Sequence, residues 1–249
     1  MSDESQANAR SSAKLGVILC DLDSYEVDEL QCLTDDAPGI SDNPVGFFEN
    51  PRSWPGIPVA YAVARGARVE PLVAGDPAAL AGFWDARERL ADCSLVITDC
   101  GFFQYARREG RPLGTTITSG LDLLSTAGML TDAPIGVLTV SEPLARRLLE
   151  DHDLADRLEI LGLQDQPGWD GILTNDHGYK NGWDLDLLRS GVVAVLERET
   201  AEGGRFAGIG ALVLECTLLP GFRREIAALT PVPILDIASF AIGALAGER

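Results

Sequence analysis

The feature that most constrains this 249-residue chain is a pattern of short apolar strands and amphipathic helices that occurs twice. The stretch GVILCD begins at Gly16, and GVLTVS begins 120 positions later at Gly136. Cys100 and Cys216, each directly after an acidic residue at the end of an apolar run, lie 116 positions apart. Strands that alternate with helices form parallel sheets covered on both faces. We therefore expect an α/β fold of two similar flavodoxin-like subdomains with parallel sheets, related by a pseudo-twofold axis.

The expected elements follow from this alternation. Strands are predicted over residues 14–21, 67–74, 94–100, 113–119, 134–141, 157–163, 209–216 and 232–238. Helices are predicted over residues 76–92, 119–128, 141–153, 184–203 and 222–229. The predicted boundaries are a disordered tail over 1–13, a first subdomain over 14–120 that also receives part of the C-terminus, and a second subdomain over 121–249.

Composition is typical of a soluble globular protein, with 46% hydrophobic and 23% charged residues. No apolar run has the length of a membrane helix, so no membrane partner is expected. The N-terminal stretch is polar and lacks the apolar core of a signal peptide, which predicts a cytoplasmic location. The formal net charge of −18 repels nucleic acid, so no nucleic-acid partner is expected either.

The five cysteines show no CxxC pair, and a cytoplasmic chain keeps them reduced. They are Cys20, Cys32, Cys93, Cys100 and Cys216. Since the chain has only two histidines, a zinc site of cysteine and histidine is poorly supported, and no metal is predicted. We interpret the first three cysteines as small buried hydrophobic residues.

The segment over residues 31–58 is rich in Pro, Gly and Asn and has neither helical nor strand periodicity. A loop of this length in a compact domain is usually a lid or a binding loop. The alternative is that this segment is a surface loop without a functional role.

Cys100 and Cys216 have a different interpretation from the other thiols because they occupy matching positions in the repeat. A thiol between a strand and a helix meets backbone N–H groups that favour its thiolate form. Two such groups on opposite faces of one carbon remove a proton from one side and supply one from the other, which inverts a stereocentre. Donors are then needed where negative charge grows. The hydroxyl groups at the predicted strand ends are Thr98, Thr139, Ser141 and Thr217.

Four stretches together carry a resemblance to a known family: ITDCGFF, LVLECTLLPGFRREI, ENPRSWPGIPVAY and IGVLTVS. They resemble the aspartate/glutamate/hydantoin racemase superfamily, and the resemblance runs from about Lys14 to the C-terminus. It implies a racemase or epimerase that works without pyridoxal phosphate or another cofactor, with Cys100 and Cys216 as paired acid and base. It also implies a small carboxylate substrate held by Asn50, Thr98, Gly101, Phe102, Thr139, Ser141 and Thr217.

Several alternatives stay open. Glutamate racemases often carry a histidine where this chain has Leu218, so the substrate is an amino acid or a related carbon acid such as a hydantoin. Isomerisation or decarboxylation of a diacid is a related possibility. GVILCDLDS resembles the first motif of magnesium-dependent haloacid-dehalogenase-like phosphatases, with Asp21 and Asp23 as the reacting carboxylates. A ligand-binding module without catalysis is a third possibility, and a homo-oligomer is as compatible with the sequence as a monomer.

Overall fold

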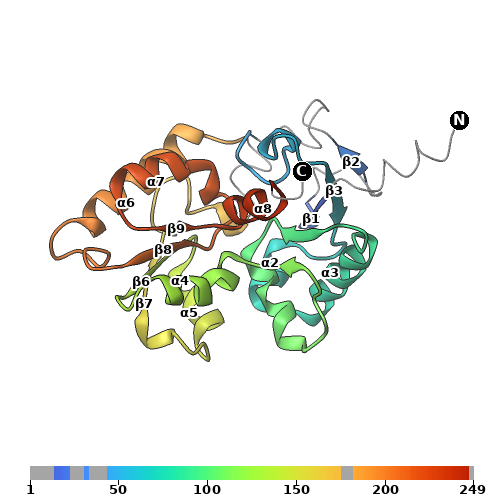
Figure 1. Ribbon diagram of the computed structural model, residues 1–249, viewed down its shortest axis with the longest axis horizontal. Coiled ribbons are helices and arrows are strands. Elements are labelled where there is room, and N and C mark those ends of the chain that lie inside the picture. Colours follow the sequence, from blue (N-terminus) through green and yellow to red (C-terminus); the bar gives the residue numbers. More distant parts are fainter. Residues whose placement is uncertain (1–13, 23–30, 34–43, 175–181, 247–249) are drawn as a thin grey trace, which may run out of the picture.

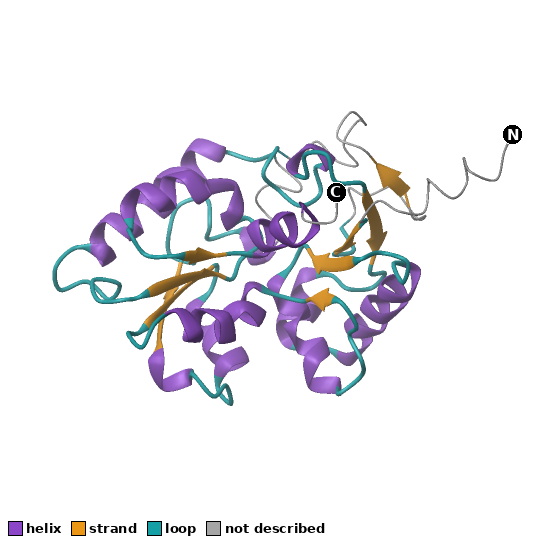
Figure 2. Cartoon of the chain, viewed as in Figure 1, coloured by secondary structure: helices purple, strands orange, loops and turns teal. Residues whose placement is uncertain are grey.

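A computed structural model of the chain describes residues 14–22, 31–33, 44–174 and 182–246. Two α/β subdomains lie side by side, each with a central sheet and flanking helices (Figures 1 and 2). The first sheet has the strand order β2-β3-β1-β4-β5 and the second has the order β7-β6-β8-β9. The strands are β1 (Leu15–Leu19), β2 (Gln31–Leu33), β3 (Val59–Val63), β4 (Leu95–Thr98), β5 (Thr116–Ile117), β6 (Ile135–Thr139), β7 (Leu158–Gly162), β8 (Ala211–Leu214) and β9 (Ile234–Leu235).

Helices follow most of the strands. The α-helices are α2 (Val69–Ala74), α3 (Pro77–Arg89), α4 (Leu124–Leu130), α5 (Glu142–Leu149), α6 (Leu185–Thr200), α7 (Arg223–Leu229) and α8 (Ile237–Ala246). Short 3-10 helices are η2 (Pro51–Ser53), η3 (Gly101–Glu109), η4 (Gly120–Leu123), η5 (Ala155–Arg157), η6 (Ile172–Thr174) and η7 (Leu219–Phe222). This alternation confirms the predicted α/β class.

Every described strand pair is parallel except β2 with β3, which is antiparallel. All five residues of β1, β3 and β6 are buried. Strands buried on both faces are continuous apolar runs rather than alternating ones, which is why stretches such as LGVIL and IGVLT form the centre of each sheet.

The two halves repeat the same backbone pairing. The Asp99 N–H donates to the Ile18 carbonyl at 3.0 Å, and the Glu215 N–H donates to the Leu138 carbonyl at 2.9 Å. The residues at matching positions are separated by the same 116 and 120 positions that relate the cysteines and the glycines in the sequence. The repeat in the sequence is therefore a repeat of the fold.

The subdomains exchange their last helices. The segment η4–α4 follows β5 of the first sheet but contacts β8 of the second, whereas α8 follows β9 of the second sheet and contacts β4 of the first. Figure 1 places α8 between the two sheets. The approach is close at Gly120, where an added Cβ would lie 2.0 Å from the Leu214 carbonyl oxygen. The exchange interlocks the two subdomains.

Several elements differ from the prediction. The segment 31–58, predicted to have no strand, contains β2, and most of the helix α8 follows the end of the strand predicted over 232–238. Residues 67–74 form the helix α2 instead of a strand, with Val69 and Leu72 buried and Gly75 ending the helix in a left-handed conformation at φ 72°. Pro71 explains the outcome, because proline cannot donate to a strand ladder but is tolerated in the first turn of a helix. The strand β3 was missed because it directly follows the Pro- and Gly-rich segment 31–58.

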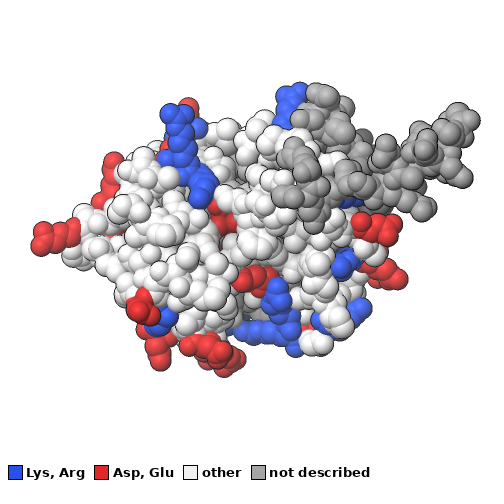
Figure 3. Space-filling view, in the orientation of Figure 1, with Lys and Arg blue, Asp and Glu red and all other residues white. Residues whose placement is uncertain are grey.

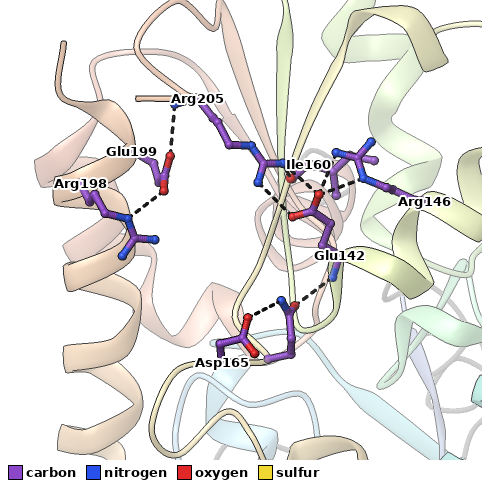
Figure 4. Close-up of polar contacts among 8 residues, drawn as sticks. Glu142, Arg146, Ile160, Asp165, Arg198, Glu199 and Arg205 are labelled. Carbon is purple, nitrogen blue, oxygen red and sulfur yellow. Dashed lines mark hydrogen bonds and ion pairs between the residues drawn. The ribbon is translucent and has the colours of Figure 1, made fainter. Parts of the chain in front are cut away.

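Glu142, the first residue of α5, anchors a group of polar contacts in the second subdomain (Figure 4). Its carboxylate accepts hydrogen bonds from Arg146 at 2.9 Å and from Arg205 at 3.0 and 3.2 Å. Although partial burial acts in the opposite direction, these two guanidinium groups hold the pKa of Glu142 below its ordinary value. Arg205 also donates to the Ile160 carbonyl, so the loop after α6 is tied to β7.

Charged side chains lie mostly around the edge of the face shown in Figure 3, and much of that face is uncharged. Within the described part of the chain, no helix combines the length and apolar character that crossing a bilayer requires.

Candidate active site

A cavity lies between the subdomains, at the C-terminal ends of β1, β4, β6 and β8. Ligands bind at this end of open parallel sheets. Its empty space, including the open mouth, is about 490 Å³. The described residues that line it are Cys20, Leu22, Val69, Asp99, Cys100, Gly101, Phe102, Val140, Ile172, Leu173, Glu215, Cys216, Thr217 and Leu218.

Cys100 and Cys216 therefore face one shared space, one from each subdomain. Cys100 follows β4 and is the N-cap residue of η3, with its side chain partly exposed. Cys216 follows β8 and is buried, at 7% exposure. Each thiol thus precedes a helical turn whose first N–H groups have no partner within the helix.

The surroundings of Cys216 keep its proton in place. Burial raises the pKa of this thiol well above its ordinary value, and the neighbouring Glu215 charge raises it further. The N–H groups of Leu218 and Leu219 act in the opposite direction. Because burial outweighs these donors, Cys216 is a protonated thiol at neutral pH, contrary to the thiolate that the helix position alone predicted.

Cys20 and Asp99 were not predicted as site residues, yet both line the cavity. The Cys20 N–H lies 3.0 and 2.9 Å from the two carboxyl oxygens of Asp99. A hydrogen bond with Cys100 and burial raise the pKa of the Cys20 thiol, while burial and the charge of Glu49 raise the pKa of Asp99. The sequence could have indicated Cys20, because it directly follows β1. Since β1 and β4 pair in parallel with Ile18 opposite Thr98, the residues that follow these two strands lie side by side.

Two predicted donors bond to the backbone. The Thr217 hydroxyl donates to the Asp99 carbonyl and so ties the two cysteine-bearing loops together. The Thr98 hydroxyl lies 3.1 Å from the Cys100 carbonyl and 2.9 Å from the Thr118 carbonyl. These contacts fix the positions of the cysteines.

Thr139, Ser141 and Asn50 are not among the described residues that line the cavity. The Thr139 hydroxyl donates to Glu215 Oε2 at 2.7 Å and accepts from the Ser141 N–H at 3.3 Å. Asn50 caps η2, where its Oδ1 accepts from the Arg52 N–H at 3.0 Å. Of the nine predicted site residues, those that line the cavity are Cys100, Gly101, Phe102, Cys216 and Thr217.

The phosphatase alternative depends on Asp21 and Asp23. Asp21 accepts hydrogen bonds from Arg65 at 2.9 Å and from the Gly66 N–H at 2.8 Å, and it is not among the described residues that line the cavity. Asp23 lies outside the described residues. In the described ranges, no group of three or more His, Cys, Asp or Glu side chains is arranged to hold a metal ion.

Two solved structures that are similar to this chain are racemases. The chain superposes on allantoin racemase from Klebsiella pneumoniae with a TM-score of 0.52 and 13% identity, covering 95% of this chain and 87% of that one. It superposes on aspartate racemase from Picrophilus torridus with a TM-score of 0.51 and 15% identity, covering 94% and 93%. The chain therefore shares the fold of these two racemases. The resemblance found in the sequence is thereby confirmed for the fold.

Curated relatives found by sequence carry a different name. The chain is 28% identical over 196 residues to a dimethylsulfoniopropionate lyase from Durusdinium sp. clade D, over 72% of this chain and 62% of that protein. It is 27% identical over 158 residues to dimethylsulfoniopropionate lyase 6 from Emiliania huxleyi (strain CCMP1516), over 57% of this chain and 39% of that protein. The chain thus spans less than two thirds of the length of these relatives. No family model matches the chain.

Proposed function

We propose that the chain is a cofactor-independent racemase or epimerase of a small carbon acid, with Cys100 and Cys216 as the acid and base. The observation that carries the proposal is that two thiols from matching positions of the repeated halves line one cavity. The fold shared with allantoin and aspartate racemases supports it. The substrate is a carboxylate or a hydantoin, in which the neighbouring carbonyl group acidifies the α-hydrogen and the site must stabilise the charge that forms when a thiolate removes it.

The surroundings of the two thiols support different starting roles for them. Cys216, buried and protonated, supplies a proton, while the more exposed Cys100 removes the α-hydrogen from the opposite face. Negative charge then grows on the substrate oxygens. Gly101, at the start of η3, and Leu218, the N-cap of η7, line the cavity, and their backbone N–H groups are candidate donors for that charge. Reprotonation by Cys216 completes the inversion, and the reverse reaction exchanges the roles.

The test is exchange of the α-hydrogen in deuterated water, followed by NMR together with loss of optical rotation, for a panel of amino acids and hydantoins. Cys100→Ser and Cys216→Ser should each lower the rate by about 10³-fold, since each removes one proton-transfer group. Cys93→Ser is the matched control, because Cys93 is buried and is not among the described residues that line the cavity. Full activity in both site variants would contradict the proposal.

A second candidate is favoured by the curated relatives, whose name is dimethylsulfoniopropionate lyase. The first step is the same removal of an α-hydrogen by a thiolate. The electron pair of the broken C–H bond then forms a carbon–carbon double bond, and the bond to a β-sulfonium group breaks, with its electrons leaving on sulfur as dimethyl sulfide. No second proton transfer to carbon is needed, so one cysteine is sufficient.

Two assays on the same set of variants distinguish the racemase from the lyase. Incubation with dimethylsulfoniopropionate and gas chromatography of the headspace measure dimethyl sulfide, while chiral chromatography measures racemised amino acid. A lyase releases dimethyl sulfide and loses that activity fully in only one of the cysteine variants. A racemase releases none and requires both cysteines.

A further inference from the structure

The cavity has an apolar wall that the proposed proton transfer does not use. The side chains that form it are Leu22, Val69, Ile172 and Leu173. Val69 is the first residue of α2, and the two residues 172 and 173 belong to η6 of the other subdomain. The helices α2 and η6 contact each other. The Asp21 N–H donates to the Ala67 carbonyl at 3.0 Å, so the chain after β1 lies beside the start of α2. These side chains therefore form one wall to which both subdomains contribute.

The polar side chains of the cavity are separate from this wall. Apart from Cys20, those among the described lining residues lie in the segments 99–100 and 215–217, which follow β4 and β8. The hydrogen bond from Thr217 to the Asp99 carbonyl holds these two segments together. The cavity thus combines a polar side, which carries the two proposed catalytic thiols, with an apolar wall contributed by other elements.

The polar side chains other than the thiols are already bonded to the protein. Both carboxyl oxygens of Asp99 lie within 3.0 Å of the Cys20 N–H. The Thr217 hydroxyl donates to a backbone carbonyl, and the Glu215 carboxyl group accepts from Thr139 at 2.7 Å. No cationic side chain is among the described lining residues. A second charged group on the substrate would therefore lose water against an apolar wall without gaining a partner, which is costly, whereas an alkyl group gains from the same contact.

We propose that the site selects a substrate with a small aliphatic group on the reacting carbon, and that Val69 and Ile172 are the residues that select it. The inference rests on the proposed function and names the substrate class of that same site. Among the carboxylates and hydantoins proposed above, it favours a methyl or ethyl side chain over one that ends in a second carboxylate. Val69 and Ile172 have this role because they are buried lining residues of the two contacting elements, one from each subdomain.

Binding of small carboxylates, measured by calorimetry at pH 7.5, tests the selection without requiring turnover. Propionate is paired with malonate and butyrate with succinate, since the members of each pair have equal numbers of carbon atoms and differ by one carboxylate. We expect each monocarboxylate to bind at least about tenfold more tightly than its partner. From acetate to butyrate, the affinity should rise by about fourfold per CH₂ group. Equal or tighter binding of the dicarboxylates, or no binding of propionate and butyrate, would overturn the inference.

A substitution on the wall tests the selecting residues. Val69→Thr keeps the shape of the side chain and adds a hydroxyl group, which can donate one hydrogen bond to a second carboxylate. The preference for butyrate over succinate should therefore fall by about fivefold. Val73→Thr is the matched control, because Val73 lies on the same helix, is partly buried and is not among the described lining residues. An unchanged preference in a folded Val69→Thr variant would show that α2 does not select the substrate.

Ile172→Ala removes alkyl contacts from the η6 side of the wall. Its affinity for butyrate should fall by about fivefold, while its affinity for acetate should change by less than about twofold, because acetate lacks the longer chain. Equal losses for the two ligands would indicate a general disturbance of the cavity and would contradict selection by Ile172.

The rate of α-hydrogen exchange provides the link to catalysis. In the natural chain, kcat/KM should be at least about tenfold higher for 2-aminobutyrate than for aspartate. If Cys100→Ser and Cys216→Ser abolish exchange but aspartate reacts as fast as 2-aminobutyrate, the inference about the substrate fails and the proposed function stands. If both cysteine variants keep full exchange, the proposed function fails, and the binding of the paired carboxylates still decides what the wall selects.

Discussion

Cys100 and Cys216 have the same side chain but different surroundings. Cys100 is partly exposed at the start of η3, whereas Cys216 is 7% exposed and its pKa is raised by burial. Since only the thiolate reacts with alkylating reagents, we expect iodoacetamide to modify Cys100 at least about tenfold faster than Cys216 at pH 7.5. Peptide mass spectrometry over a time course measures both rates. Faster modification of Cys216 would contradict the assignment of this residue as the initial proton donor.

Glu215 also makes folding stability depend on pH. Its pKa is about 7 in the folded chain against an ordinary 4.5, so between these values the folded state keeps a proton that the unfolded state has lost. Stability is therefore greatest below pH 4.5 for this group and falls as pH rises to about 7, by about 3 kcal/mol. Urea denaturation of Glu215→Gln at pH 5 and pH 8 should show a smaller loss than the natural chain. An identical loss in both proteins would show that Glu215 ionises normally.

Glu142 affects the pH dependence of folding stability in the opposite direction. Its pKa is lowered in the folded chain, so its contribution is present above the ordinary value and is lost as pH falls below it. Since this carboxylate is partly exposed, solvent weakens the contribution. Glu142→Gln should therefore change how folding stability depends on pH in acid, below the ordinary pKa of a glutamate. Between pH 5 and pH 8 this dependence should match that of the natural chain.

Among the secondary-structure elements, the exchanged helices are the feature that a substitution can test directly. An alanine Cβ at Gly120 would lie 2.0 Å from the Leu214 carbonyl oxygen, which would push η4 away from β8. Gly120→Ala should lower the free energy of unfolding by about 1–3 kcal/mol, as overpacking does. Gly208→Ala is the matched control, because no atom lies within 4 Å of its added Cβ. Urea denaturation measures both, and equal stability of the two variants would contradict the close approach.

The elements also show where a local pattern misleads. ARVEPLVA alternates as a strand does, but Pro71 removes a ladder donor and the segment forms α2. VAYAV forms β3 between β2 and β1 in the first sheet, although it directly follows a segment rich in Pro and Gly. Partner strands decide such cases, because pairing with β1 stabilises β3 more than its own short sequence does.

For the molecule as a whole, the net charge of −18 lowers the stability of the folded state, and added salt reduces this effect. Repulsion among like charges destabilises the compact state, and added ions screen it. Raising NaCl from 0.1 to 1 M at pH 7.5 should raise the melting temperature by several degrees. Near pH 4.4, the calculated isoelectric point, the same addition should have little effect. Scanning calorimetry measures both, and an equal gain at the two pH values would exclude charge screening as the cause.

The two halves meet through contacts that no single half could form. Thr217 of the second half donates to the Asp99 carbonyl of the first, and Arg108 donates to the Arg147 carbonyl at 3.0 Å. The cavity between them is lined by both subdomains, so its chemistry depends on their relative position.

The sequence by itself determined the α/β class, the repeat of the two halves and the positions of Cys100 and Cys216 at strand ends. These are properties of periodicity and spacing along the chain, which local backbone preferences and apolar patterning express directly. Five of the nine predicted site residues line the cavity for the same reason, since they lie in the segments that begin two residues after β4 and β8 end.

Only the tertiary structure decided which polar groups face that cavity. Thr139 bonds to Glu215 across 76 positions, Cys20 to Asp99 across 79 and Thr217 to Asp99 across 118. These distant partners direct the hydroxyl groups of Thr139 and Thr217 toward protein atoms. Burial raises the pKa of Glu215 and keeps the proton on Cys216. Such effects depend on which groups are brought together and how much water is excluded, and neither quantity is present in any short stretch of the chain.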